Sequence, residues 1–184
     1  MSPTVSIHHD DHLKGRTDAG IVLVEYGDYQ CPYSRQAHAA VKDLQQRLGD
    51  QLCFIYRHFP LTGKHPYAEL AAEAAEAAAE QGKFWDMHDA LFEMQPQFAP
   101  ELLPELAERL DMSAEALAED MRTRRFQGPV ELIAAGGTHI GVVETPTFFI
   151  NGERHEGDSD ELSLVSAIMR LVRTIVSRRA WPAR

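Results

Sequence analysis

The sequence predicts an α/β fold in which a mixed central sheet carries an inserted block of helices. Short apolar runs rich in β-branched and aromatic residues occur near both ends of the chain, and such runs are typical of buried strands. Between them, apolar residues recur at helical spacing. The predicted order is therefore strand, helix and strand, then a block of helices, then two strands and a last helix.

The first part of the chain reads as a βαβ unit that follows an irregular lead-in over residues 1–19. Residues 21–24 (Ile-Val-Leu-Val) are typical of a strand buried on both faces, and this strand continues to Tyr26. A helix is predicted over 32–48, where Gly49 supplies a stop signal, and a second strand over 52–56. Such a connection is almost always right-handed.

The middle of the chain is predicted to be helical throughout. The first of these helices is rich in alanine, the strongest helix former, whose small side chain permits close packing between helices. Ser113 is typical of an N-cap. The predicted ranges are 66–80, 84–92, 100–111, 113–122 and 128–140.

Strand signals return near the C-terminus. Residues 147–150 (Thr-Phe-Phe-Ile) predict a strand, and the following Asn151-Gly152 is a strong signal for a two-residue hairpin. The returning strand is expected over 153–156. A last helix is predicted over 161–177 from its apolar stripe.

Composition and charge exclude several classes of protein. The chain has 184 residues and a formal net charge of −10, which argues against nucleic acid and anionic membranes as partners. No stretch has the apolar length needed to span a bilayer. The N-terminus lacks the pattern of a signal peptide, so a cytoplasmic location is expected, although a starting Met can also stand where a leader has been trimmed.

The residues with the clearest chemistry are Cys31-Pro32-Tyr33-Ser34, at the predicted passage from the first strand into the first helix. A cysteine at a helix N-terminus lies near the positive end of the helix dipole, which favours thiolate over thiol. Pro32 suits the first helical position because it needs no N–H partner there. The alternative is an inert buried cysteine, as free cysteines often are.

These residues resemble the DsbA-like branch of the thioredoxin superfamily. The resemblance rests on the Cys31 motif, on Thr145-Pro146-Thr147 before a strand, and on the order of elements, and it runs from about His12 to the end of the last helix. It implies one domain over 1–184 with a thioredoxin fold and an inserted helical subdomain. The thioredoxin-fold parts would be about 20–62 and 142–177, and the insertion about 63–141.

Three catalytic residues are expected. The resemblance implies Cys31 as the nucleophile and Glu25 as a group that relays protons from beneath the cysteine, and the hydroxyl of Ser34 could stabilise the Cys31 thiolate by donating a hydrogen bond. A buried carboxyl at Glu25 would have a raised pKa, because burial disfavours its charged form. The alternative for Glu25 is an ordinary strand-end residue facing solvent.

The resemblance also implies a substrate-binding set of Pro32, Tyr33, Thr145 and Pro146. Pro146 would follow a cis bond beside the cysteine, and the backbone of Thr145 would pair with an extended substrate segment. The alternative for Pro146 is an ordinary trans proline before a strand.

One departure from the family pattern bears directly on function: Ser34 stands where the family has a second, resolving cysteine. The chain is therefore expected to act as a monothiol oxidoreductase, in disulfide shuffling or deglutathionylation, with an external thiol resolving each adduct. Three alternatives stay open. They are a Ser variant, engineered or natural, of a dithiol oxidoreductase, a non-catalytic peptide-binding module, and a glutathione-dependent isomerase or transferase.

The remaining expectations concern cofactors and other side chains. No cofactor is expected, although glutathione or another small thiol could serve as co-substrate beside a protein or peptide with a thiol or disulfide. No metal is expected, because the histidines near the N-terminus match no closed zinc spacing. Cys53 and His88 are expected to belong to the core. His58 and His65 flank the helical block, and the sequence does not place them further.

Overall fold

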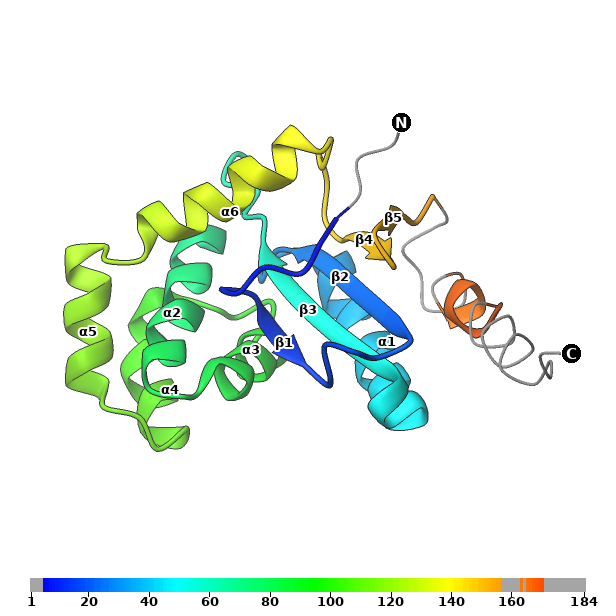
Figure 1. Ribbon diagram of the computed structural model, residues 1–184. Coiled ribbons are helices and arrows are strands. Elements are labelled where there is room, and N and C mark those ends of the chain that lie inside the picture. Colours follow the sequence, from blue (N-terminus) through cyan, green and yellow to red (C-terminus); the bar gives the residue numbers. More distant parts are fainter. Residues whose placement is uncertain (1–4, 157–162, 164, 171–184) are drawn as a thin grey trace, which may run out of the picture. The chain divides into compact units, whose positions relative to one another are not determined.

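The computed structural model describes residues 5–156, 163 and 165–170 of the chain (Figure 1). Its five-stranded sheet has the order β1-β3-β2-β4-β5. The strands are β1 (His12–Lys14), β2 (Ile21–Gly27), β3 (Leu52–His58), β4 (Thr147–Ile150) and β5 (Glu153–Arg154).

The predicted βαβ unit is confirmed. Strands β2 and β3 are neighbours in the sheet, and α1 (Pro32–Leu48) connects them. All residues of β3 are buried, as are all of β2 except the intermediate Val22, which explains their continuous apolar sequences. β3 runs to His58, two residues beyond the predicted end.

The irregular lead-in predicted for residues 1–19 is wrong in one segment, because β1 pairs antiparallel with β3. His12 lies opposite Tyr56 and Lys14 opposite Phe54. Three residues are too few for an alternating pattern to be recognised. Gly15, with φ of +107°, ends this strand where a Cβ atom would lie 2.2 Å from the Leu52 carbonyl oxygen, so only glycine fits.

The hairpin predicted at Asn151-Gly152 is confirmed. Both residues have positive φ, 50° and 86°, as a type I′ turn requires. The Asn151 side chain also fixes the turn to the start of β2, because its Oδ1 accepts the Val22 N–H at 2.8 Å. β5 ends at Arg154, before the predicted end. Residues 165–170 of the predicted last helix are helical, and much of the rest of that range lies outside the described residues.

The helical block contains α2 to α6 and is centred on α2, which packs against α3, α5 and α6 (Figure 1). Seven alanines of α2 have at most 2% of their surface exposed, so their small side chains let helices approach from several sides. Ser113 caps α5 as predicted, by accepting the Ala116 N–H at 3.2 Å. The helices are α2 (Ala68–Glu80), α3 (Phe84–Glu93), α4 (Leu103–Arg109), α5 (Ala114–Thr123) and α6 (Gln127–His139).

The predicted helix over 100–111 is interrupted: a 3₁₀ turn, η2 (Pro100–Leu102), precedes α4. The helix predicted from Pro66 begins at Ala68, after a turn. Among the described residues, no helix combines the length and the apolar character needed to cross a bilayer.

The contacts divide the described chain into two compact units. The first draws on the ranges 1–25, 36–56 and 146–184, and the second on 26–35 and 57–145. The first unit contains most of the sheet, and the second contains the helical block. Cys31, Ser34 and Thr145 all belong to the second unit, so their mutual geometry is defined within it.

Two adjacent glycines of α6 provide a test of packing in the second unit. A Cβ on Gly137 would lie 2.9 Å from Tyr26 Cε1 and 3.0 Å from Phe59 Cδ2, whereas a Cβ on Gly136 would meet nothing within 4 Å. Gly136→Ala should therefore raise the free energy of unfolding by about 1 kcal/mol through helix propensity. Gly137→Ala should lower it by about 1–2 kcal/mol through overpacking. Urea unfolding of both variants measures this, and changes of the same sign would contradict the packing described.

Candidate active site

Cys31 directly precedes α1, at the N-cap position. Its carbonyl accepts the Arg35 N–H at 3.1 Å, which is the first bond of the helix, and its own N–H donates to the Asp28 carbonyl at 3.1 Å. Only 3% of the residue is exposed. The predicted position of Cys31 at the positive end of a helix is therefore confirmed.

The Cys31 sulfur contacts the backbone of Thr145, which is 114 residues away in the sequence. The thiol donates to the Thr145 carbonyl oxygen at 3.2 Å. Two residues singled out in the sequence are thus brought together within one unit. Because the carbonyl can only accept, this hydrogen bond exists only while the sulfur carries its proton.

Ser34 is fully buried in the first turn of α1, but its hydrogen bond differs from the expected one. Its Oγ accepts the Asp28 N–H at 3.3 Å. The hydrogen bond expected from Ser34 to Cys31 is not found among the described residues, where the sulfur instead donates to Thr145. The sulfur is instead paired with a carbonyl oxygen, which can only accept, so in this arrangement the thiol serves as donor and the Ser34 Oγ as acceptor.

Asp28 is a residue of the site that the sequence analysis missed. Its buried carboxylate accepts three hydrogen bonds, from Gln30 N–H at 2.7 Å, Leu61 N–H at 2.9 Å and His65 Nδ1 at 2.7 Å. With its backbone bonds to Cys31 and Ser34, Asp28 links the motif to the loop after β3. The available signal was an acidic residue just past a buried strand and three residues before the cysteine.

Gln95 is a second residue that the sequence analysis missed. Its buried side-chain amide donates to the carbonyl of Cys31 at 3.3 Å and to the carbonyl of Tyr29. Gln95 thus donates to carbonyl groups of the turn, while the Asp28 carboxylate accepts a backbone N–H of the same turn. No sequence motif marks Gln95, which lies in the loop between α3 and η2.

The cis bond expected before Pro146 stays a prediction. A cis peptide bond is present at Gln95–Pro96, and the Gln95 side chain contacts the Cys31 turn. Two members of the expected substrate-binding set are exposed, Pro32 at the start of α1 and Tyr33 with 64% of its surface accessible, whereas Thr145 is buried.

Glu25 is buried in β2 within the first unit, with 1% of its surface exposed. The alternative of a solvent-facing strand end is therefore wrong. Burial raises the pKa of Glu25 to about 8, as expected for a carboxyl removed from water. Its Oε1 has no hydrogen-bond partner among the described residues. The proton-relay role of Glu25 stays a prediction.

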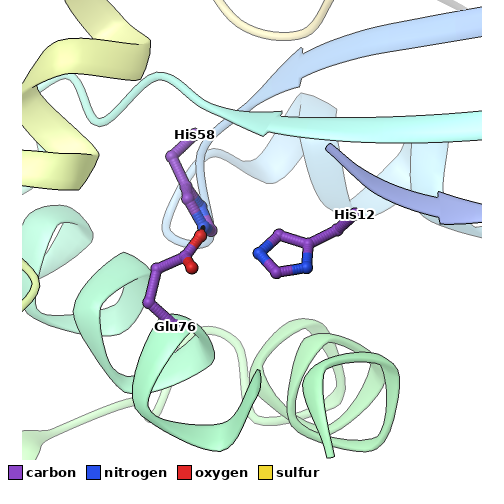
Figure 2. Close-up of side chains that lie close together, drawn as sticks. All are labelled: His12, His58 and Glu76. Atoms are coloured by element: carbon purple, nitrogen blue, oxygen red, sulfur yellow. Dashed lines mark hydrogen bonds and ion pairs between the residues drawn. The ribbon is translucent and has the colours of Figure 1, made fainter. Parts of the chain in front are cut away.

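A cluster of aromatic and histidine side chains lies behind the Cys31 turn. The Tyr29 ring packs on His58, His88 and Phe92, and the Tyr29 hydroxyl and His88 Nδ1 share a hydrogen bond of 3.0 Å. Figure 2 shows the His58 ring, at the end of β3, beside the Glu76 carboxylate of α2, at 2.8 Å. The predicted core position of His88 is confirmed.

Cys53 is also confirmed as a core residue. It lies in β3 with none of its surface exposed, and burial raises the pKa of its thiol. Both cysteines of the chain are free. A thiol that is buried and hard to ionise is a poor nucleophile, so Cys53 is disfavoured as a reactive sulfur, and the nucleophilic role of Cys31 stays a prediction.

Comparison with known proteins decides the family. The model of a family described as Thioredoxin matches residues 8–170. The chain belongs to this thioredoxin family. The structure of BdbD from Bacillus subtilis is 27% identical, with a TM-score of 0.82 over 94% of this chain and 97% of that one. Wolbachia pipientis α-DsbA1, 19% identical, covers 94% of this chain and 96% of its own with a TM-score of 0.80, which shows the shared fold.

The DsbA-like thioredoxin fold with its added helices is therefore confirmed, and it is the fold of thiol-disulfide oxidoreductases. The chain is also 44% identical to the Na(+)/H(+) antiporter NhaA 3 of Salinispora tropica over 161 residues. That match covers 86% of this chain but only 24% of the antiporter. The chain thus spans about a quarter of the length of this curated relative.

The raised pKa of Glu25 predicts a pH-dependent stability. The folded state holds this proton up to about pH 8, whereas the unfolded chain loses it near 4.5. Stability from this group is therefore greatest at low pH and falls as the pH rises from 4.5 to 8, by up to about 1.4 kcal/mol per pH unit. Glu25→Gln removes this effect. Its stability relative to the wild type, from urea unfolding, should increase between pH 5 and 8, and a constant difference would contradict the buried neutral carboxyl.

Proposed function

We propose that this DsbA-like chain is a thiol-disulfide exchange enzyme that works through a single sulfur, Cys31, and depends on an external thiol. The observation that carries the proposal is the pairing of Cys31 at the N-cap of α1 with Ser34 in its first turn. A serine at that position cannot form a disulfide. The second cysteine, Cys53, is buried in β3 and free.

The first step is attack by the Cys31 thiolate on a substrate disulfide. The N-cap position supports the thiolate, because side-chain atoms there face the free N–H groups of the first helical turn and the positive end of the helix. The sulfur forms a new S–S bond with one substrate sulfur. The other substrate sulfur leaves with the bonding electron pair as a thiolate and takes a proton from water.

The second step is resolution by an external thiol. Its thiolate attacks the mixed disulfide and expels the Cys31 thiolate, so the sulfur group held on Cys31 leaves as a disulfide with the external thiol. Glutathione is the proposed co-substrate, and deglutathionylation of a protein thiol, with release of oxidised glutathione, is the simplest balanced reaction. A reducing compartment such as the cytoplasm would supply that thiol.

Backbone recognition of the substrate is proposed at Thr145. Its carbonyl lies 3.2 Å from the Cys31 sulfur and has a second lone pair for an incoming peptide N–H. The exposed Tyr33 ring, two residues after Cys31, offers apolar contact area to the same substrate. These features support a protein or peptide substrate over a small molecule alone.

The antiporter relatives suggest one class of partner. They include a segment similar to this chain within a much longer protein named for Na⁺/H⁺ antiport. We propose that thiols of a membrane transporter are among the substrates. Without a resolving cysteine, mixed disulfides with Cys31 persist until an external thiol arrives, so non-reducing isolation followed by mass spectrometry identifies the partner. Adducts only to unrelated proteins would overturn this assignment.

The monothiol proposal predicts one glutathione adduct per chain. On exposure to oxidised glutathione, the wild type and Cys53→Ser should each gain one glutathione, removable by thiol, and Cys31→Ser should gain none. Intact-protein mass spectrometry measures this directly. An unmodified wild type would refute the proposal, as would an adduct that persists in Cys31→Ser.

Restoring the missing cysteine should change the chemistry from monothiol to dithiol. Ser34→Cys is expected to form an internal disulfide with Cys31 under oxidising conditions and to acquire dithiol reductase activity toward insulin. Ser34→Ala is the matched control and should acquire neither property. Failure of Ser34→Cys to oxidise while it stays folded would show that the site lacks disulfide geometry.

A further inference from the structure

We propose that His65 and Asp28 form a positioning pair that sets the Ser34 hydroxyl as a donor to the Cys31 thiolate. The inference rests on the proposed thiol exchange and deepens it. Cys31, Asp28, Ser34 and His65 all belong to the second compact unit. A continuous set of hydrogen bonds joins His65 to Asp28 and Asp28 to Ser34.

The first link joins His65 to Asp28. His65 Nδ1 lies 2.7 Å from Asp28 Oδ2, and because a carboxylate only accepts, this nitrogen carries a proton. The other donors to the carboxylate are the backbone amides of Gln30 and Leu61. His65 is therefore the one side chain recorded on this buried carboxylate, and with 20% of its side chain exposed it is also the partner that reaches solvent.

The second link joins Asp28 to Ser34 and Cys31. The Asp28 N–H donates to Ser34 Oγ at 3.3 Å, and the Asp28 carbonyl accepts the Cys31 N–H at 3.1 Å. The carboxylate holds Asp28 in place, and its backbone in turn holds both residues of the motif. Since one lone pair of Ser34 Oγ is used by this N–H, the direction of its hydroxyl proton is restricted.

The third link forms when Cys31 ionises. The thiol donates to the Thr145 carbonyl, and after its proton passes to water the sulfur can only accept. Ser34 lies one helical turn further along α1 and keeps its hydroxyl proton for such an acceptor. Ionisation thus exchanges the Thr145 carbonyl for the Ser34 hydroxyl as the partner of the sulfur. The expected bond from Ser34 belongs to the thiolate rather than to the resting thiol.

The segment that carries His65 is also tied to the Cys31 turn at a second point. The Tyr67 N–H donates to Gln30 Oε1 at 2.6 Å. The stretch from Leu61 to Tyr67 therefore supports the turn from Asp28 to Cys31 through three hydrogen bonds, of which only one depends on the His65 side chain. Loss of that side chain should misdirect Ser34 while the other two bonds keep the loop in place.

The test measures the second-order rate of Cys31 with oxidised glutathione at one fixed pH, in the full chain. His65→Leu removes the donor and should slow the reaction about tenfold. His65→Asn keeps an N–H at the position of Nδ1 and should stay within about threefold of the wild type. Lys64→Leu, an exposed neighbour in the same loop, is the control for a general effect of the substitution. Equal reaction rates for His65→Leu and His65→Asn would overturn the proposed positioning pair.

A double-mutant cycle separates positioning from loosening of the fold. If His65 acts through Ser34, His65→Leu should slow the reaction less than twofold once Ser34→Ala is present. An unchanged tenfold loss in that background would overturn the proposal.

If His65→Leu fails to fold, His65→Gln replaces it. The side-chain N–H of the glutamine lies one bond further from the backbone, so it cannot reach Asp28 in the same way. A wild type that takes no glutathione refutes the proposed function itself, whereas a reactive wild type with equally reactive variants refutes only this inference.

Discussion

The geometry of the site depends on one constraint: the chain must turn from β2 into α1 and leave a sulfur at the start of the helix. The turn over residues 28–31 has no regular secondary structure to hold it, so its backbone groups need other partners. Asp28 supplies them on the N–H side and Gln95 on the carbonyl side. Both side chains are buried, which makes these bonds stronger than they would be in water.

A buried carboxylate is costly unless donors surround it, and this cost shapes the neighbouring loop. The Asp28 carboxylate takes two backbone N–H groups and one histidine N–H, enough to replace its lost hydration. Glu25 shows the opposite solution. It has no recorded donor on Oε1, so its burial is met by keeping the proton, with a pKa near 8. Two acidic residues three positions apart thus accommodate burial in different ways because their surroundings differ in donors.

Much of the fold follows from patterns that the sequence contains. The continuous apolar strands, the helix after Pro32 and the Asn151-Gly152 turn each have a local physical cause, and each was predicted correctly. β1 escaped detection because a three-residue strand is specified by its pairing with β3 rather than by its own residues. The division of residues 100–111 into η2 and α4 does have a local signal, because Pro104 lies in the first turn of α4, where proline is tolerated, and would interrupt a helix that ran through it.

The site itself was only partly predictable. Cys31, Ser34 and Thr145 stand in recognisable motifs. The bonds that join Asp28 to Leu61 and His65, and Gln95 to Tyr29 and Cys31, instead span 33 to 66 residues of sequence. Such bonds arise from tertiary contacts and leave no periodic trace. The partner of Ser34 was also missed, although it is a backbone N–H only six residues earlier, because an irregular turn carries no periodic signal.

The serine at position 34 changes what the turn has to accomplish. In a dithiol site the second cysteine removes the substrate by intramolecular attack, so the lifetime of the mixed disulfide is set within the site. In the proposed monothiol mechanism, the adduct would wait for a second molecule to reach a sulfur whose residue is only 3% exposed. A small, flexible thiol would meet that requirement better than the thiol of a folded protein. The buried position of Cys31, together with Ser34, therefore supports the proposal of a glutathione-like co-substrate on steric as well as chemical grounds.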